Sequence, residues 1–347
     1  MELMENNNTF GPEIEDELYE HHRFEVAKGQ QALRVDKFLM NLIENVTRSK
    51  IQKAADAGNI LVNGESVKSN YKVKPDDVVQ LMLEHPPYEH LLKGENIPLD
   101  IVYEDDQLLV VNKPAGMVVH PAVGNWSGTL VNGLIYHFTN LPNSCDLAYR
   151  PGLVHRLDKN TSGVMVIAKS ELAMLDLAKQ FFDRTIDRRY NALVWGVPKE
   201  TEGTIKTNLA RSLKNRKQVG VFEYEGEIGK HAITHYKLLR DMQYVSLVEC
   251  KLETGRTHQI RVHMQHIQHP VFNDNEYGGD KIIKGLPTAN YKRFIENCFE
   301  LIPGQALHAR TLELTHPATG ERMRFEKELP EGFQAIIERF EKAQLSV

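Results

Sequence analysis

Apolar residues near the start of the chain recur with the spacing of an amphipathic helix. They fall at i, i+3, i+4 and i+7, so one face of a predicted helix should be buried. These residues are Val35, Phe38, Leu39 and Leu42. A second helix is predicted over residues 48–58, with Thr47 as its N-cap and Gly58 at its end. The Asn63-Gly64 pair that follows lies between two short β-type runs and indicates a hairpin, so residues 23–84 should form one small module.

Beyond this module the pattern changes to short apolar runs interspersed with helical stretches. Three prolines between residues 85 and 98 predict a linker over 85–97. Strands are predicted at 101–105, 108–112, 164–168, 190–195 and 245–250, and helices at 171–182 and 294–301. This mixture predicts an α+β domain over 98–347, built on a mainly antiparallel mixed sheet with flanking helices. A chain of 347 residues is also long enough for two separate cores.

The formal net charge of −5 conceals an uneven distribution. Residues 1–22 hold seven acidic residues and no Lys or Arg, and removing those seven charges from −5 leaves +2 for the remainder. We interpret residues 1–22 as an acidic, disordered leader, with an arm that mimics RNA as the alternative. No apolar run approaches the ~20 residues needed to cross a bilayer, no secretory signal is recognisable, and the three cysteines lie far apart. We therefore expect a cytoplasmic protein without membrane contact or a disulfide framework.

Basic residues cluster on the small module. Four segments, at 33–39, 47–51, 58–64 and 74–77, resemble the S4 RNA-binding domain in the same order. The resemblance implies that RNA is contacted by Arg34, Lys37, Arg48, Ser49, Lys50, Lys53 and Asn63. Positive charge beside a helix N-terminus attracts phosphate oxygens without reading bases, so this module should hold RNA and not choose the nucleotide. The alternative is that these side chains form an ordinary solvated face.

Asp158 is the sharpest candidate for chemistry. If residues 153–158 run extended, Arg156 and Asp158 project to the same side of the segment. The turn-rich residues 159–163 follow and lead into the apolar run at 164–168, so Asp158 should stand at a strand end. The alternative is that the Asp158 side chain only caps the turn through an Asx hydrogen bond.

The segment 252–263 supplies a second set of polar residues. Thr257 is a predicted N-cap, and Ile260, Met264 and Ile267 recur at i, i+4 and i+7, which predicts a helix that packs inward. An arginine on such a helix, Arg261, could pair with a carboxylate and keep it ionised. Four histidines at 258, 263, 266 and 269 invite a metal interpretation, but no Cys or carboxylate completes a recognisable ligand spacing.

These segments together resemble the ribosomal large-subunit branch of the pseudouridine synthases over nearly the whole chain. The matching stretches are 97–105, 111–114 with 119–121, 152–163, 184–190, 254–263, 277–279 and 306–309. The resemblance implies that Asp158 is catalytic, Arg261 pairs with it, Tyr190 stacks on the target base and Arg156 fills the place that the base vacates in the RNA. It also implies substrate contacts from His155, Thr161, Asn112, Lys113, Arg256, His258 and Ile260. Asn273 departs from the pattern, because a glycine is common there.

The implied reaction converts an extruded uridine to pseudouridine. Asp158 would drive cleavage of the N1–C1′ bond, after which the trapped uracil rotates and C5 rejoins C1′. Attack on the ribose, attack on the base and abstraction of a ribose proton all remain open. The implied substrate is 23S ribosomal RNA, at a stem-loop of the subunit interface within a large-subunit precursor, and transfer RNA is the alternative. We expect a monomer that uses no cofactor and no metal.

Two other classes of protein were weighed. A conventional glycoside hydrolase needs a second carboxylate opposite the first, and the region around Asp158 offers Arg and His instead. A non-catalytic RNA-binding protein of the S4 type explains the basic residues but not the combination of Asp158, Arg261 and Tyr190.

Overall fold

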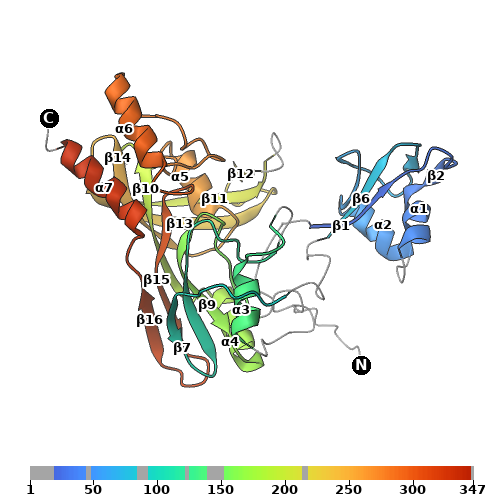
Figure 1. The fold of residues 1–347 in the computed structure, drawn as a ribbon, viewed down its shortest axis with the longest axis horizontal. Helices are drawn as coiled ribbons and strands as arrows, with labels where there is room; N and C mark the ends of the chain where they lie inside the picture. Colours follow the sequence, from blue (N-terminus) through green and yellow to red (C-terminus); the bar gives the residue numbers. More distant parts are fainter. Residues whose placement is uncertain are drawn as a thin grey trace. The chain divides into compact units, whose positions relative to one another are not determined.

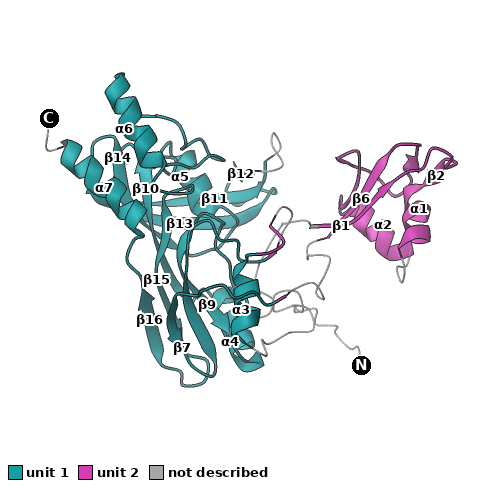
Figure 2. Cartoon of the chain, viewed as in Figure 1, with its two compact units in different colours: residues 1–14, 94–120, 128–347 teal, residues 15–93, 121–127 magenta. Residues whose placement is uncertain are grey.

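The computed structural model describes residues 19–43, 48–83, 93–121, 125–138, 152–212 and 218–344. Two compact units divide the chain, with a boundary between Lys93 and Gly94, and Figure 2 colours them separately. The predicted cap Thr47 lies outside the described residues, as do residues 1–18 of the acidic leader. Within the described part of the chain, no helix is both long and apolar enough to span a membrane.

The smaller unit packs its two helices against short strands (Figure 1). Its elements are β1 Tyr19–Glu25, β2 Leu33–Arg34, α1 Val35–Leu42, α2 Arg48–Asp56, β3 Ile60–Val62, β4 Glu65–Ser66, β5 Lys72–Val73 and β6 Val78–Leu83. The strands form one sheet in the order β1-β6-β3-β4 and a separate β2-β5 pair. The hairpin prediction is confirmed, because Asn63 and Gly64 join β3 to β4 with φ of 52° and 84°.

Two details of the smaller unit differ from the sequence prediction. Leu42 was expected on the buried face of the first helix, but it is 47% exposed, because it is the last residue of α1 and reaches past the core. Strand β1 begins at Tyr19, so the last four residues of the predicted leader are ordered by pairing with β6. Hydrogen bonding along a whole strand outweighs their acidic and polar character.

The larger unit is built on a 10-stranded sheet. Its strands are β7 Ile101–Glu104, β8 Leu108–Lys113, β9 Ser162–Ala168, β10 Asp187–Trp195, β11 Glu202–Arg211, β12 Val219–Phe222, β13 Lys230–Asp241, β14 Val245–Leu252, β15 Leu307–Thr315 and β16 Arg322–Glu326. The order is β12-β11-β13-β14-β10-β15-β9-β8-β7, with β16 paired to β15. Among the pairings of these described strands, β9 with β15 is parallel and the others are antiparallel, so the predicted mixed sheet is confirmed.

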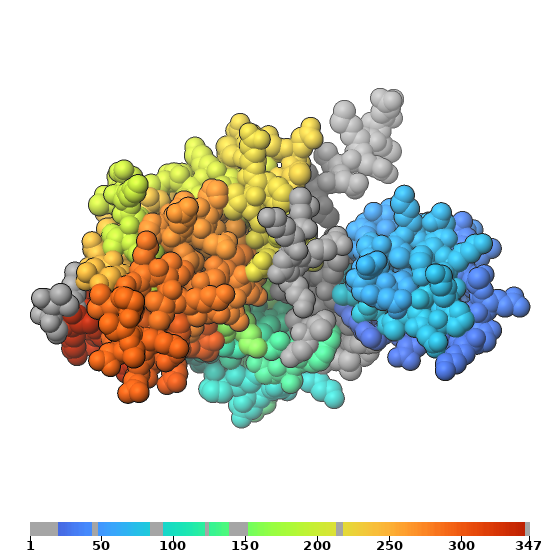
Figure 3. Space-filling model, turned by 90° about the horizontal axis from the view of Figure 1, so that it is seen from above, coloured from blue at the N-terminus to red at the C-terminus, as the bar shows by residue number. Residues whose placement is uncertain are grey.

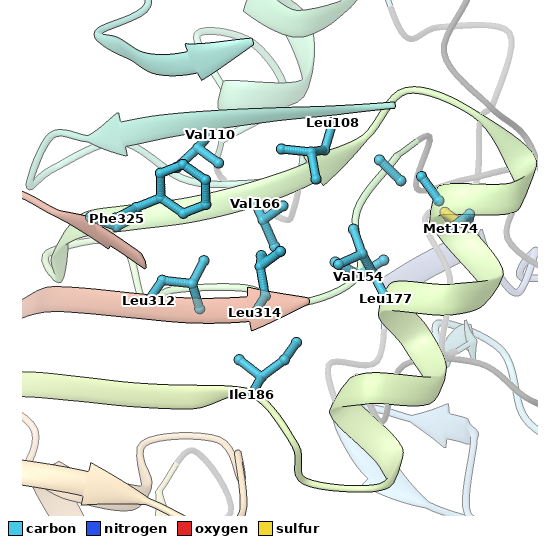
Figure 4. Packing of buried hydrophobic residues seen from close by; sticks show 13 residues of the cluster. Leu108, Val110, Val154, Val166, Met174, Leu177, Ile186, Leu312, Leu314 and Phe325 are labelled. Carbon is cyan, nitrogen blue, oxygen red and sulfur yellow. The ribbon is translucent and has the colours of Figure 1, made fainter. Parts of the chain in front are cut away.

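Helices cover parts of this sheet. They are α3 Leu130–His137, α4 Glu171–Phe182, α5 Gln259–His266, α6 Ala289–Phe299 and α7 Glu331–Gln344. Helix α4 matches its prediction at both ends, and Figure 4 shows Leu177 of this helix beside Val154, with Val166 and Leu314 of the sheet nearby. Helix α6 begins five residues earlier than predicted, because Thr288 caps it by accepting a hydrogen bond from Tyr291 N. In the space-filling view the orange region, which includes α6, forms part of the visible surface (Figure 3).

Close packing fixes two segments of the larger unit. At the parallel pair, a Cβ on Gly163 would stand 2.2 Å from the carbonyl oxygen of Ala309, so β9 can approach β15 this closely only with glycine. Residues 94–97, predicted as linker, instead lie against α3: a Cβ on Gly94 would stand 3.0 Å from the backbone of Tyr136, and Glu95 N donates to Asn132 O. That part of the linker prediction is wrong, because backbone hydrogen bonding ties the segment to the helix.

Candidate active site

One cavity of about 430 Å³ collects most of the polar residues singled out by the sequence. Its walls come from residues 154–158 before β9, the end of α4, the start of β10, and the segment 252–261 that runs from β14 into α5. Because β10 and β9 lie on either side of β15, segments distant in sequence meet here. The volume is in the range of small-ligand pockets.

Asp158 lies in this cavity with its carboxylate held by a charge pair. Its Oδ2 accepts a hydrogen bond of 3.0 Å from Arg261 Nη1, and its Oδ1 is 3.9 Å from His258 Nε2. Burial alone would raise the pKa of Asp158, but electrostatic interactions with His258, Arg261 and Arg156 lower it to about 2. The turn after it is closed by the backbone, since Thr161 N donates to the carbonyl oxygen of Asp158. The Asx-cap alternative is therefore not what the structure contains.

The buried Arg261 guanidinium contacts three carboxylates. Asp274, which is fully buried, accepts from Nε at 2.7 Å and from Nη2 at 2.9 Å, so its carboxylate binds the guanidinium in a bidentate manner. Glu276 accepts from Nη2 at 2.6 Å. Burial opposes the charge, but these carboxylates raise the pKa of Arg261 further above its ordinary value. Arg261 is thus a fixed cation whose remaining nitrogen points at Asp158.

Helix α5 reaches the site through an unexpected turn. Thr257 was predicted as the N-cap, but the helix begins at Gln259, and His258 occupies the cap position with a left-handed φ of 55°. The Gln259 side chain explains the shift: its Oε1 accepts from Thr254 Oγ1 and from Arg256 N, which fixes the loop before the helix. The turn brings the His258 imidazole to within 2.8 Å of the Tyr277 hydroxyl as well as near Asp158.

Tyr190 stands on β10 and lines the same cavity. It is 7% exposed, and burial raises the pKa of its hydroxyl. Ile260, also buried and in the cavity wall, supplies an apolar surface. An apolar and aromatic slot beside an ionised carboxylate suits a nucleobase with its sugar near Asp158.

Other predicted substrate contacts fall on the wall with different partners. His155 Nε2 accepts from Val166 N and its ring stacks on Phe181 at 4.8 Å, while burial lowers its pKa to about 3. It is therefore a neutral packing residue. Arg156 and Thr161 line the cavity, and Thr161 accepts from Gln305 Nε2. Arg256 also lines the cavity, and its Nε donates to the carbonyl oxygen of His231.

Asn112 and Lys113 do not line the cavity. Asn112 lies on β8, and its side-chain amide donates to Asp100. Lys113 is fully buried, and its Nζ donates to the carbonyl oxygens of Pro114, Met117 and Lys159. Burial lowers the pKa of Lys113 to about 7. The Lys113 side chain thus holds the turn that follows Asp158, through its hydrogen bond to the carbonyl oxygen of Lys159.

In the smaller unit, a buried aspartate organises the predicted RNA-binding arginines. Asp36 accepts from Nε and Nη2 of Arg34, at 3.1 and 2.9 Å, and from Arg48 Nε at 3.1 Å. Burial opposes its charge, but hydrogen bonds from these arginines and Gln52 lower the pKa of Asp36 to about 2. The other predicted contacts, Lys37, Ser49, Lys50 and Lys53, are exposed. Asn63 is exposed but has both amide atoms bonded within the turn, to Asp77 and to Val78 N.

Two charged residues at or beside the cavity, Asp274 and Arg188, were not predicted from the sequence. Asp274 was passed over although it precedes Tyr277-Gly278-Gly279, a quoted matching stretch. Arg188 was passed over although strand alternation puts it on the same face as Tyr190, and that alternation could have identified it. Among the described residues no group of three or more His, Cys, Asp or Glu side chains is arranged to hold a metal ion. His263, one of the four histidines, hydrogen-bonds Thr207 and Thr234 instead.

Comparison with known proteins assigns the class. Residues 107–266 match the RNA pseudouridylate synthase family and residues 33–79 match the S4 domain. A protein named "Uncharacterized RNA pseudouridine synthase" from Chlorobaculum parvum is 49% identical over 316 residues, which cover 91% of this chain and 96% of that protein. The chain belongs to the RNA pseudouridine synthase family, and it is an isomerase that converts uridine to pseudouridine in RNA.

Relatives with more specific names are also similar. The "Ribosomal large subunit pseudouridine synthase D" of Zymomonas mobilis is 41% identical over 308 residues, covering 88% of this chain and 92% of that protein. The protein of the same name from Pasteurella multocida is 37% identical over 90% of this chain and 93% of its own length. Among solved structures, Human RNA Pseudouridylate Synthase Domain Containing 4 shares the fold, with a TM-score of 0.53 and 24% identity over 70% of this chain and 92% of that one.

Proposed function

We propose that this enzyme isomerises specific uridines of 23S ribosomal RNA, in a stem-loop at the subunit interface, and that Asp158 is its catalytic residue. The observation that carries the catalytic assignment is the Asp158–Arg261 pair inside the cavity, at 3.0 Å. The relatives named for the ribosomal large subunit support the choice of substrate over transfer RNA. The substrate is met as a large-subunit precursor in the cytoplasm.

In the proposed reaction the target uridine leaves the RNA helix and enters the cavity, where Tyr190 stacks on the base. Extrusion costs a few kcal/mol, which stacking partly offsets. Arg156, on the cavity wall, fills the vacated place in the RNA. Arg261 keeps Asp158 ionised, so that the carboxylate can promote cleavage of the N1–C1′ bond. Uracil turns while enclosed and C5 bonds to C1′. C5 then loses its proton and N1 gains one, so the product is an isomer of the substrate.

The test of the catalytic assignment is Asp158→Asn, which keeps the size of the side chain but removes its charge. Isomerisation of unmodified 23S transcript should be lost while RNA binding stays intact. Unchanged isomerisation would overturn the assignment of Asp158. The substrate is tested separately by mapping pseudouridines in ribosomal and transfer RNA from cells with and without the gene. Loss of transfer RNA sites alone would overturn the ribosomal substrate.

A further inference from the structure

Arg188 is a buried cation in the cavity wall that the reaction described above does not use. It stands on β10 two residues before Tyr190, on the same face of the strand, and is 9% exposed. Its Nε is buried without a hydrogen-bond partner. Among the residues that the structure describes, no carboxylate forms an ion pair with its guanidinium. Burial accordingly lowers the pKa of Arg188.

Packing, in place of charge pairing, holds this guanidinium. The Phe181 ring lies under it, with 5.3 Å from the ring centroid to Cζ. On another side is Gly255, where an added Cβ would stand 2.6 Å from Arg188 Nη1. Phe181 and Gly255 both line the cavity, so the fold positions an arginine at its wall between an aromatic ring and a bare backbone.

The neighbouring residue shows what a structural arginine looks like on the same strand. Arg189 faces the other side of β10, and it donates to Asp187 and to Glu249, each at 2.9 Å. It is thus neutralised by the protein itself. Arg188 has no such partner, and an unpaired buried charge is costly unless a ligand brings the opposite charge.

We propose that Arg188 binds a backbone phosphate next to the target uridine. A phosphate is the anion that RNA brings beside every nucleoside, and the planar guanidinium fork matches its oxygens. Arg188 and Tyr190 lie on one face of β10, so the phosphate and the base of one nucleotide would be held by the same strand. The inference rests on the proposed use of this cavity by the target uridine, but not on which RNA carries it.

The first experiment compares three ligands in equilibrium binding: uridine 3′,5′-bisphosphate, uridine and inorganic phosphate. The protein is the full chain, either unchanged or carrying Arg188→Met, with Arg189→Met as the matched control. The unchanged protein should bind the bisphosphate about 10- to 100-fold more tightly than uridine, the range expected for hydrogen bonds to a charged group. Arg188→Met should remove this preference and Arg189→Met should keep it. The uridine 3′- and 5′-monophosphates then identify which phosphate is bound.

Two outcomes would overturn the proposal. One is a bisphosphate preference that survives in Arg188→Met. The other is inorganic phosphate binding as tightly as the bisphosphate, because the site would then be a general anion site without a link to the nucleoside. Asp158→Asn should retain the bisphosphate preference, so a failure of the catalytic assignment and a failure of this one give different results.

A stability measurement separates this role from a merely structural one. If Arg188 is kept for a phosphate, Arg188→Met removes an unpaired buried charge and should leave the melting temperature of the free protein equal or higher. A lower melting temperature would indicate a structural arginine and count against the proposal. Gly255→Ala provides a second variant with Arg188 still present. Its Cβ displaces the guanidinium, so the bisphosphate preference should fall there too, and an unchanged preference would contradict the proposal.

Discussion

Asp274 grips Arg261 through both oxygens of its carboxylate, at 2.7 Å to Nε and 2.9 Å to Nη2, and thereby aims the remaining nitrogen at Asp158. Asp274 lies behind Arg261 and is fully buried, so it touches no substrate. Its Oδ1 also accepts from Glu276 N and Tyr277 N, so the same carboxylate holds the loop that follows α5. It is a positioning residue, and its effect on the reaction passes through Arg261.

Asp274→Asn should therefore slow the reaction while leaving RNA binding nearly unchanged. A misplacement of about 1 Å at a reacting group can cost about 100-fold in rate, and we expect a loss of up to that size. Single-turnover isomerisation and filter binding measure the two effects. Glu296→Gln, on the exposed surface of α6, is the control and should change neither. Equal losses in rate and binding would argue for general unfolding of the loop.

The acid side of the activity profile should depend on Arg261. The pKa of Asp158 lies at about 2, below its ordinary 3.8, so the carboxylate is ionised throughout the neutral range and activity falls only as the pH drops toward that value. Arg261→Gln removes a positive charge, so the pKa of Asp158 rises and the acid limb moves to higher pH. The measurement is the pH dependence of the single-turnover rate, within the range where circular dichroism shows a folded protein. An acid limb at the same pH in both proteins would contradict the pairing.

Tyr190→Ala should weaken capture of the target base. Stacking of a base on an aromatic ring is worth about 1–3 kcal/mol, which corresponds to about 5- to 150-fold. Tyr190→Ala should lower the binding affinity for RNA whose target uridine can leave the helix. The affinity should fall less for a second RNA, in which a nucleotide that stays stacked replaces that uridine. Competition binding with the two RNAs checks this, and equal losses would exclude a stacking role.

The smaller unit should lose both stability and RNA affinity in Asp36→Asn. Asp36 has a pKa of about 2 in the fold against an ordinary 3.8, so its stabilisation is present above about pH 4 and disappears as the pH falls toward 2. At pH 7 we expect a loss of about 1–3 kcal/mol, the range for hydrogen bonds to a charged group. Hydrogen exchange of the α1 amides, measured at pH 7 and at pH 3, gives the stability difference between the unchanged protein and Asp36→Asn. A stability difference that is as large at pH 3 as at pH 7 would be inconsistent with this explanation.

Asn273 stands where a glycine is common in the family, and its contacts show what the asparagine adds. Its φ is 61°, a conformation that glycine adopts without strain, and its amide donates to the carbonyls of Phe299 and Ile302 at the end of α6. Asn273→Ala combines backbone strain with two lost hydrogen bonds and should cost about 1–3 kcal/mol in thermal or urea denaturation. Asn273→Gly loses only the hydrogen bonds and should be the more stable of the two variants. The reverse order would refute this account.

Local patterns predicted some of the elements, but not β11, β12, β13, β15, β16, α3 or α7, and the site needed more than local patterns. The alternation in β-branched runs and the Asn63-Gly64 turn are properties of adjacent residues, so strands, hairpin and α4 were predictable. Asp158 and Arg261 were candidates from their local sequence, and the family resemblance implied their catalytic roles. Lys113 was misplaced because its ammonium is occupied by carbonyl groups distant in sequence. The cap at His258 was missed because a side chain of the helix itself, Gln259, fixes the loop before it.

The position of β15 has a consequence for synthesis of the chain. It separates β9, which follows Asp158, from β10, which carries Tyr190, although it is made more than a hundred residues after either. A nascent chain that has emerged only as far as α6 contains every residue of the cavity except Leu307, yet the strand that joins its two sides is missing. Long-range pairing of this kind is slow to form. We therefore expect the two sides of the cavity to be joined only after β15 has been synthesised.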